Sequence, residues 1–158
     1  MSDIEKRIYA ITRFMLAEDP EEREKIKAEL KAFGDFSRPP ADPETITRSI
    51  FLEIGVPEHL RGYEPAIYAI TLIVKDRKYL DNVTHLLYPA VAKEFDNTKS
   101  GIERCIRSCV EHAWQRGNID VLTRYFGYST NPERGKPTNS EFLARIANVV
   151  KQRIRYDA

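Results

Sequence analysis

Three charged side chains between Ser100 and Glu111 have the types and spacing that could recognise a base sequence in DNA. If this stretch is a helix, its apolar residues form one stripe made of Ile102, Cys105, Ile106, Cys109, Val110 and Ala113. Glu103, Arg104 and Arg107 are left on the polar side. Arginine can pair bidentately with O6 and N7 of guanine, and glutamate can accept a hydrogen bond from the N4 amine of cytosine. We therefore predict that these three residues read bases in the major groove of double-stranded DNA.

Cationic and hydroxyl side chains around the same helix could hold the DNA backbone. Contacts of this kind position a protein on the duplex without reading its sequence. The small residues Ser100 and Gly101 would let the helix end approach a phosphate, which the free amides of a helix N-terminus bind. We predict backbone contacts from Lys93, Lys99, Ser100, Ser108, Arg116 and Lys136.

A plainer interpretation accounts for the same charges. Glu103 and Arg107 are four residues apart, a spacing at which two side chains form a weak ion pair on a solvated helix face. Lys136 precedes the last predicted helix and fits a solvated loop as well as it fits a phosphate contact. The residue pattern alone leaves both interpretations open.

The elements around these residues have the size and order of a helix-turn-helix. A short helix is predicted over 89–95, followed by the polar turn Asp96-Asn97-Thr98-Lys99. A long helix is predicted to begin at Ser100 and to end at Gly117. In such a unit the second helix enters the major groove.

The start of the chain predicts a helical hairpin over residues 1–34. Ser2 and Glu5 form a capping-box pattern at the start of a helix near 3–18. Asp19 followed by Pro20 starts a second helix, which Gly34 would end. A proline-containing linker is predicted over 35–43.

Residues 44–158 are predicted to form a helical bundle that contains the helix-turn-helix. Apolar residues recur at helical spacing and alternating strand patterns are absent, so the fold class is all-α. Outside the helix-turn-helix, helices are expected over 43–54, 63–76, 79–87, 118–126 and 139–155. The helix over 63–76 is apolar on much of its surface and is expected to be central.

Composition excludes several classes of protein. The 158 residues are 42% hydrophobic and 31% charged, as in a globular chain. No apolar run approaches the roughly 18 residues of a membrane span and the N-terminus lacks a secretion signal, so we expect a cytoplasmic protein without a membrane partner. Residues 1–44 carry 8 basic and 11 acidic side chains, whereas residues 45–158 carry 17 and 13. The second part is therefore the better partner for a polyanion.

No residue pattern is typical of an enzyme or a metalloprotein. The chain has no glycine-rich phosphate loop and no nucleophile–base pattern, and its three histidines are scattered. Cys105 and Cys109 both lie on the predicted apolar stripe, which favours core packing over a metal pair or a disulfide. We expect no catalytic residue, no metal and no cofactor.

Several motifs, spread over residues 45–155, resemble one family. They are EIGVPEHLRGY (53–63), LLYPAVAKEF (86–95), IERCIR (102–107), AWQRGNID (113–120), FGY (126–128) and KPTNSEF (136–142). In this order and spacing they resemble the C-terminal effector domain of the stage-zero sporulation response regulators, the master transcription factors of endospore-forming bacteria. The resemblance implies an all-helical domain that binds a short operator box.

The resemblance also assigns roles to particular positions. Glu103, Arg104 and Arg107 match the positions of the family's recognition helix. The family implies a transcription regulator that binds tandem boxes as a homodimer and contacts the sigma subunit of RNA polymerase, through a surface that we place around 118–128. Gly101 stands where the family has an arginine, so one DNA contact is expected to be missing.

The family's effector domain follows a phosphoacceptor receiver domain with an α/β fold. Residues 1–44 show no strand pattern, so we do not expect them to build the parallel sheet that places an aspartyl phosphate. We therefore expect no switching by aspartate phosphorylation within this chain.

The predicted hairpin keeps a second class of function open. In it the protein is an interaction module or an antagonist, the hairpin pairs the chain with a copy of itself or with a partner, and DNA binding is secondary. The apolar residues Ile4, Ile8, Ile11, Phe14 and Phe33 need a surface to bury them. That surface could be the core of the same chain or a second copy.

Overall fold

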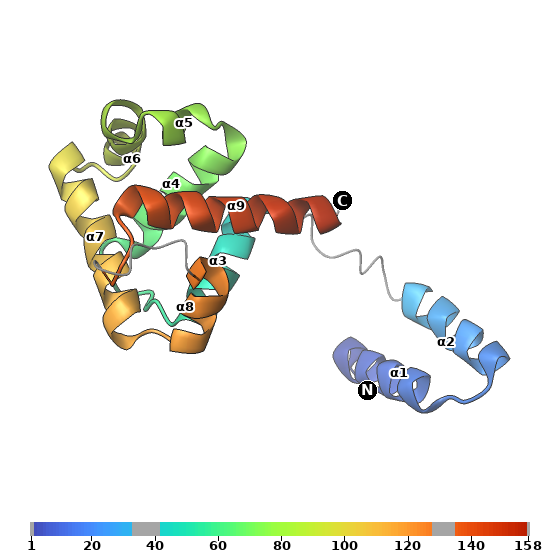
Figure 1. The fold of residues 1–158 in the computed structure, drawn as a ribbon. Helices are drawn as coiled ribbons and strands as arrows, with labels where there is room; N and C mark the ends of the chain where they lie inside the picture. Colours follow the sequence, from blue (N-terminus) through green and yellow to red (C-terminus); the bar gives the residue numbers. More distant parts are fainter. Residues whose placement is uncertain (1, 33–41, 128–134, 158) are drawn as a thin grey trace. The chain divides into compact units, whose positions relative to one another are not determined.

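The computed structural model describes residues 2–32, 42–127 and 135–157, and the chain is helical without strands in these segments (Figure 1). The all-α fold class is thus confirmed. The chain divides into two compact units, Met1–Pro40 and Ala41–Ala158, which we call the hairpin unit and the C-terminal unit. No helix in the described segments is long and apolar enough to cross a membrane.

The hairpin unit consists of α1 (Asp3–Leu16) and α2 (Pro20–Ala32). The predicted capping box is present. The Ser2 amide donates to the Glu5 carboxylate at 2.6 Å, and the Glu5 amide donates to the Ser2 hydroxyl at 3.2 Å. The described residues of this unit form no strand, so they do not build the sheet of a receiver domain.

Parts of three predicted segments lie outside the described residues. The predicted linker is described only from Asp42, which already caps the next helix, because its carboxylate accepts from the Thr45 amide at 3.2 Å. The end of α2 predicted at Gly34 falls outside as well. The segment between the predicted helices over 118–126 and 139–155 is described only at its two ends.

The C-terminal unit is a bundle whose helices are joined by short turns. Its elements are α3 (Pro43–Ile54), α4 (Tyr63–Lys75), α5 (Lys78–Asp81), the π-helical turn η1 (Val83–Leu87), α6 (Tyr88–Glu94), α7 (Lys99–Arg116), α8 (Ile119–Phe126) and α9 (Asn139–Asp157). The predicted bounds are correct to within two residues except over 79–87, where the single predicted helix is wrong. Asn82 leaves helical geometry there, with φ −142° and ψ 69°, and its side chain accepts from the His85 amide at 3.3 Å to start η1.

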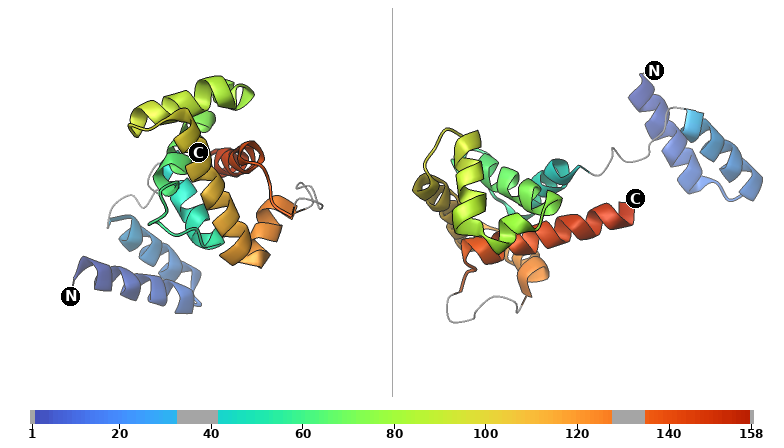
Figure 2. Two further views of the ribbon diagram at one scale, coloured as in Figure 1. Left: turned by 90° about the vertical axis from the view of Figure 1, so that its left-hand side faces the viewer. Right: turned by 90° about the horizontal axis from the view of Figure 1, so that it is seen from above.

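The helix α4 lies at the centre of the bundle, as its sequence predicts. It packs against α3, α7 and α9, and Figure 2 shows this arrangement from two further sides. Its residues Ile67, Ile70 and Ile73 are at most 2% exposed. Each fully buried side chain of this size contributes roughly 1.5–3 kcal/mol of hydrophobic stabilisation, so α4 is the main support of the unit.

The contact between α4 and α7 is close enough to require glycine. A Cβ atom at Gly62 would lie 2.0 Å from the carbonyl oxygen of Cys105 and 2.9 Å from Sγ of Cys109. Because the first of these atoms belongs to the backbone of α7, a side chain at this position would separate the two helices.

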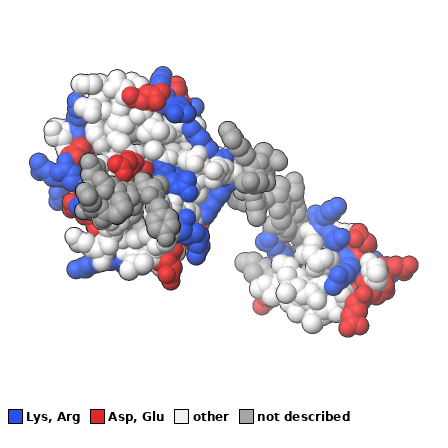
Figure 3. Space-filling model, in the orientation of Figure 1, with Lys and Arg blue, Asp and Glu red and all other residues white. Residues whose placement is uncertain are grey.

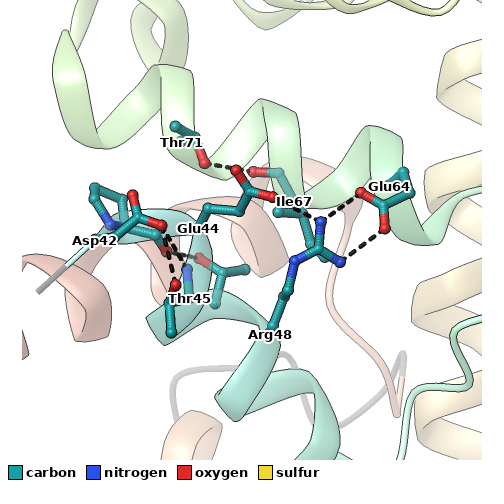
Figure 4. A network of polar contacts seen from close by, with 9 residues as sticks. Asp42, Glu44, Thr45, Arg48, Glu64, Ile67 and Thr71 are labelled. Atoms are coloured by element: carbon teal, nitrogen blue, oxygen red, sulfur yellow. Dashed lines mark hydrogen bonds and ion pairs between the residues drawn. The ribbon is translucent and has the colours of Figure 1, made fainter. Parts of the chain in front are cut away.

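A polar network joins α3 to α4 at the edge of the core (Figure 4). The Arg48 guanidinium donates to both carboxylate oxygens of Glu64, at 2.7 and 2.8 Å, and to Glu44 at 2.7 Å. These hydrogen bonds lower the pKa of Glu64. The network orients α3 on α4 where the apolar contact ends.

Candidate nucleic-acid interface

The turn between α6 and α7 closes through local hydrogen bonds. The Phe95 amide donates to the Val91 carbonyl at 3.1 Å and ends α6. Asp96 then takes a positive φ of 47°, a conformation that aspartate tolerates better than most residues. The Asn97 amide donates to the Ala92 carbonyl at 2.9 Å, so the turn folds back on the helix that it leaves.

The helix α7 begins at Lys99, one residue before the predicted start. Thr98 is extended, with φ −88° and ψ 155°, and its hydroxyl accepts from the Gly101 amide at 3.0 Å. Thr98 is therefore the N-cap. Ser100 lies in the first turn and is exposed, which leaves its hydroxyl available at the surface.

The apolar stripe of α7 is buried as predicted, with one exception. Ile102, Ile106, Cys109, Val110 and Ala113 are at most 2% exposed. Cys105 is only half-buried, because it lies at the edge of the stripe, and its expected place within the buried stripe is wrong. This stripe fixes which side of α7 faces outward.

Both thiols are free. Burial, followed by the proximity of Cys105, raises the pKa of Cys109 to about 12, so Cys109 packs as a neutral thiol. No group of three or more potential metal ligands occurs in the described ranges.

The three predicted base-reading residues lie on the outer side of α7, within its first half. Arg104 is exposed, and it forms no ion pair with any described residue. The side chain of Arg107 is 55% exposed and that of Glu103 is 34% exposed, and these two form an ion pair. Their hydrogen bond raises the pKa of Arg107, which therefore stays charged. The ion pair of the plainer interpretation is thus present in the structure.

Asn139 at the start of α9 ties α7 to its neighbours. Its side-chain amide donates to the Glu103 carbonyl at 2.9 Å and to the Tyr88 hydroxyl at 3.2 Å. Single-residue reasoning missed this contact, which joins positions 36 and 51 residues apart. The motif KPTNSEF, which contains Asn139, was the signal that could have indicated it.

A groove of about 540 Å³ runs beside the outer side of α7. Its lining comes from η1, α6, α7 and the segment 136–140, and it includes Tyr88, Glu103 and Arg107. Lys136 borders the groove and forms an ion pair with Glu111 at 2.9 Å, so it is not a solitary loop cation.

The predicted backbone-contacting residues do not all gather around the base-reading ones. Lys99 and Ser100 lie in the first turn of α7 and Ser108 lies near its middle. All three are exposed, as is Lys93 on α6. Arg116 lies twelve residues beyond Arg104, roughly 18 Å along the axis, and is rotated by about 120° from it. Arg116 is therefore separate from the base-reading residues.

The charged surface of the C-terminal unit is mixed. Figure 3 shows Lys and Arg side chains interspersed with Asp and Glu along the side that carries α7, with no uniformly basic face in this view.

A short helix, a tight turn and a long helix with an exposed polar side have the order found in helix-turn-helix DNA-binding domains. Residues 47–150, which run from α3 into α9, match the family described as the C-terminal domain of the sporulation initiation factor Spo0A. The match covers most of the C-terminal unit, and the chain belongs to this family. It is a family of DNA-binding regulatory domains of sporulation and not a family of enzymes.

Proposed function

We propose that this protein is a sequence-specific transcription regulator that binds double-stranded DNA through the outer side of α7. The observation that carries the proposal is the division of α7 into two faces. Its apolar face is buried in the core, and its polar face, which carries two arginines in the first half of the helix, is exposed. An α-helix of this kind fits the major groove of B-form DNA.

In this proposal Arg104 and Arg107 read guanines and Glu103 reads a cytosine. Arg104 is already exposed and has no ionic partner among the described residues. Arg107 and Glu103 are paired with each other, so binding either opens their ion pair or uses it as one bidentate group. Opening it costs little, because ion pairs on solvated helix faces contribute only about 0.3–0.5 kcal/mol.

The proposed contacts with the DNA backbone come from three places around α7. Lys99 and Ser100 lie at the start of α7, where free amides and the helix dipole attract a phosphate, and Ser108 lies on the same outer side. Lys93 and Lys136 flank α7 from α6 and from the groove. Arg116 would contact a phosphate only at a distance from the bases that Arg104 reads.

Two protein partners belong to the same proposal. The sigma subunit of RNA polymerase would contact residues around 118–128, where Ile119 of α8 is 74% exposed and a smaller groove includes Trp114 and Phe126. A second copy of the chain would occupy the neighbouring operator box, because tandem boxes need one C-terminal unit each.

The test is binding to a labelled duplex that carries the family's operator box, compared with a scrambled duplex, over about 50 to 200 mM salt. A specific regulator prefers the box by at least ~10³ and loses affinity steeply as salt increases. Weak and equal binding to both duplexes would contradict the proposal.

A second candidate is a protein-interaction module in which DNA binding is secondary. It is favoured by the exposed apolar side chains of α1, among them Met15 and Leu16, each 75% exposed. Gly101 also favours it, because the family's arginine is absent there. Loss of specific binding in the duplex experiment, together with capture of a partner through α1, would support this candidate.

A further inference from the structure

The helix α1 is apolar on the side that faces its own unit and also on the side that faces away. Ala10 and Ala17 are buried against Ile26 of α2, and Phe14 and Leu30 are partly buried beside them. The large apolar side chains that remain exposed on α1 are Ile8 (59%), Tyr9 (59%), Ile11 (48%), Met15 (75%) and Leu16 (75%). Figure 3 shows this part of the hairpin unit as a largely uncharged surface.

These exposed residues form one continuous surface. Ile8, Ile11 and Met15 follow at i, i+3 and i+7, which places them on one stripe, and Tyr9 and Leu16 run parallel to it. Thr12 lies between these two rows. Its hydroxyl donates to the carbonyl of Ile8 at 2.8 Å, so the hydrogen bond of this hydroxyl is made within the helix. We call these five apolar residues the α1 outer face.

The hairpin unit is too small to be stable with this face in water. Among its described residues, the buried core consists of Ala10, Ala17 and Ile26. Units below roughly 40 residues usually need a disulfide, a metal or oligomerisation. Both cysteines of the chain lie in the C-terminal unit, and no metal-ligand group occurs among the described residues. The ion pairs among its described residues, such as Arg13 with Glu29 at 3.4 Å, are exposed and contribute little.

The described part of the C-terminal unit has no continuous stripe of exposed large apolar side chains like the α1 outer face. Its exposed large apolar side chains are Leu52, Phe95 and Ile119, which come from three separate parts of the bundle. Phe95 already contacts the ring of Tyr68 edge-on, with 5.8 Å between centroids. A second α1, in contrast, presents the same stripe, and a two-fold interface joins identical patches.

We propose that two copies of this chain associate through their α1 outer faces, so that two hairpins form a four-helix bundle. An antiparallel pairing centred near Ile11 sets Ile8 of one copy against Met15 of the other. Residues 2–32 carry 7 basic and 8 acidic side chains, so net charge does not keep two hairpins apart. Taking about 200 Å² for each large side chain when fully exposed, the face covers roughly 600 Å² per copy, close to the ~800 Å² of a standard interface.

The consequence for DNA recognition rests on the proposed function. A dimer joined at the hairpins carries two C-terminal units, so binding of one operator box raises the effective concentration of the second unit at a neighbouring box. The hairpin would then determine the preference for paired boxes, and α7 would determine the preference for the sequence of each box.

The test measures the mass of the full chain by analytical ultracentrifugation without DNA, from low to high micromolar concentration. The chain mass is 18.3 kDa, and we expect the wild type to reach twice this mass. The double variant Ile8→Glu/Met15→Glu is expected to raise the dimer dissociation constant at least tenfold. Ala28→Glu, at an exposed position of α2, and Leu52→Glu, at the exposed apolar position of α3, are matched controls that keep the dimer.

A second measurement excludes simple unfolding of the hairpin as the cause. Thr12→Cys is exposed beside the stripe and is expected to cross-link two copies under mild oxidation, whereas Ala28→Cys is not. A monomeric wild type, a dimeric Ile8→Glu/Met15→Glu variant, or equal cross-linking at both positions would each overturn the proposal. Because no DNA is present, these results do not depend on whether α7 reads a base sequence.

Discussion

The helices α7 and α1 each bury one face and expose the other, but their exposed faces have opposite chemistry. The apolar stripe of α7 packs against α4, α6 and α9, and the outer face of α7 carries Glu103, Arg104 and Arg107. The inner side of α1 is covered by a single helix, and its outer face is apolar. One helix therefore belongs to a complete core, and the other belongs to an incomplete one.

The difference indicates which kind of partner each face suits. A charged face is well solvated in water and binds when another charged or hydrogen-bonding surface replaces the water, as the DNA grooves do. An apolar face is unfavourable in water by roughly 25 cal/mol per Å², and it binds when a second apolar face covers it. We therefore propose nucleic acid as the partner of α7 and protein as the partner of α1. Four experiments test this difference between the two helices.

The largest expected effect comes from breaking the complete core. Gly62→Ala should lower the free energy of unfolding by about 3 kcal/mol, because the new Cβ meets the backbone of α7 at Cys105. Urea denaturation of the full chain measures this change. The matched control is Gly101→Ala, whose Cβ meets the side chain of Asn97, which can rotate away. Equal losses at both positions would show that the α4–α7 contact adapts and that the core is looser than its geometry indicates.

The second effect concerns the polar face itself. Arg104→Ala should weaken binding to the operator box by roughly 1–3 kcal/mol and leave binding to a scrambled duplex almost unchanged. Lys99→Ala should weaken both duplexes alike, because phosphate contacts carry no sequence information. Gln115→Ala, at an exposed position in the far half of α7, is the control and should change neither. Parallel losses on both duplexes for Arg104→Ala would remove it from the base-reading residues.

A smaller gain is expected from adding charge to the same face. Gly101→Arg should tighten DNA binding by a few-fold and increase the magnitude of the salt slope by about 1, since one more cation reaches a phosphate. A Cβ atom at position 101 would lie 2.2 Å from Oδ1 of Asn97, so the new side chain must displace Asn97. The double variant Gly101→Arg/Asn97→Ala removes this collision and should therefore bind DNA at least as tightly. An unchanged affinity in both variants would mean that this position does not face the DNA.

The smallest effect is the pH dependence of the α3–α4 contact. Hydrogen bonds from Arg48 lower the pKa of Glu64 from its ordinary 4.5. The stability from this pair is therefore fully present above pH 4.5 and is lost as the pH falls through the pKa of the folded state. Because the Glu64 side chain is 52% exposed, Glu64→Gln should cost no more than about 0.5–1 kcal/mol at pH 7 and almost nothing at pH 3. A constant difference between these pH values would contradict the assignment.

The helices and the orientation of α7 could be predicted from local patterns. Apolar spacing placed Ile102, Ile106 and Val110 inside and Arg104 outside, because a side chain's direction on a helix depends only on its position. Caps and stops followed from single residues: Ser2 starts α1, and Gly117 ends α7. These signals are short-range, so they are readable without knowledge of the fold.

Contacts between distant residues were beyond such patterns. Tyr125 of α8 donates to Glu53 of α3 and accepts from Arg153 of α9, and nothing in the spacing of these residues indicates that they meet. The bonds of Asn139 to α6 and α7 and the pairing of Lys136 with Glu111 belong to the same group.

The amino-acid sequence by itself determined the all-α class, the position of the helices, the family and the polar face of α7. Tertiary structure decided the rest. It left Cys105 at the edge of the core, paired Glu103 with Arg107 beside a groove, and left the α1 outer face uncovered. The reason is physical: helical periodicity fixes which residues share a face, but burial depends on whether another element packs against that face.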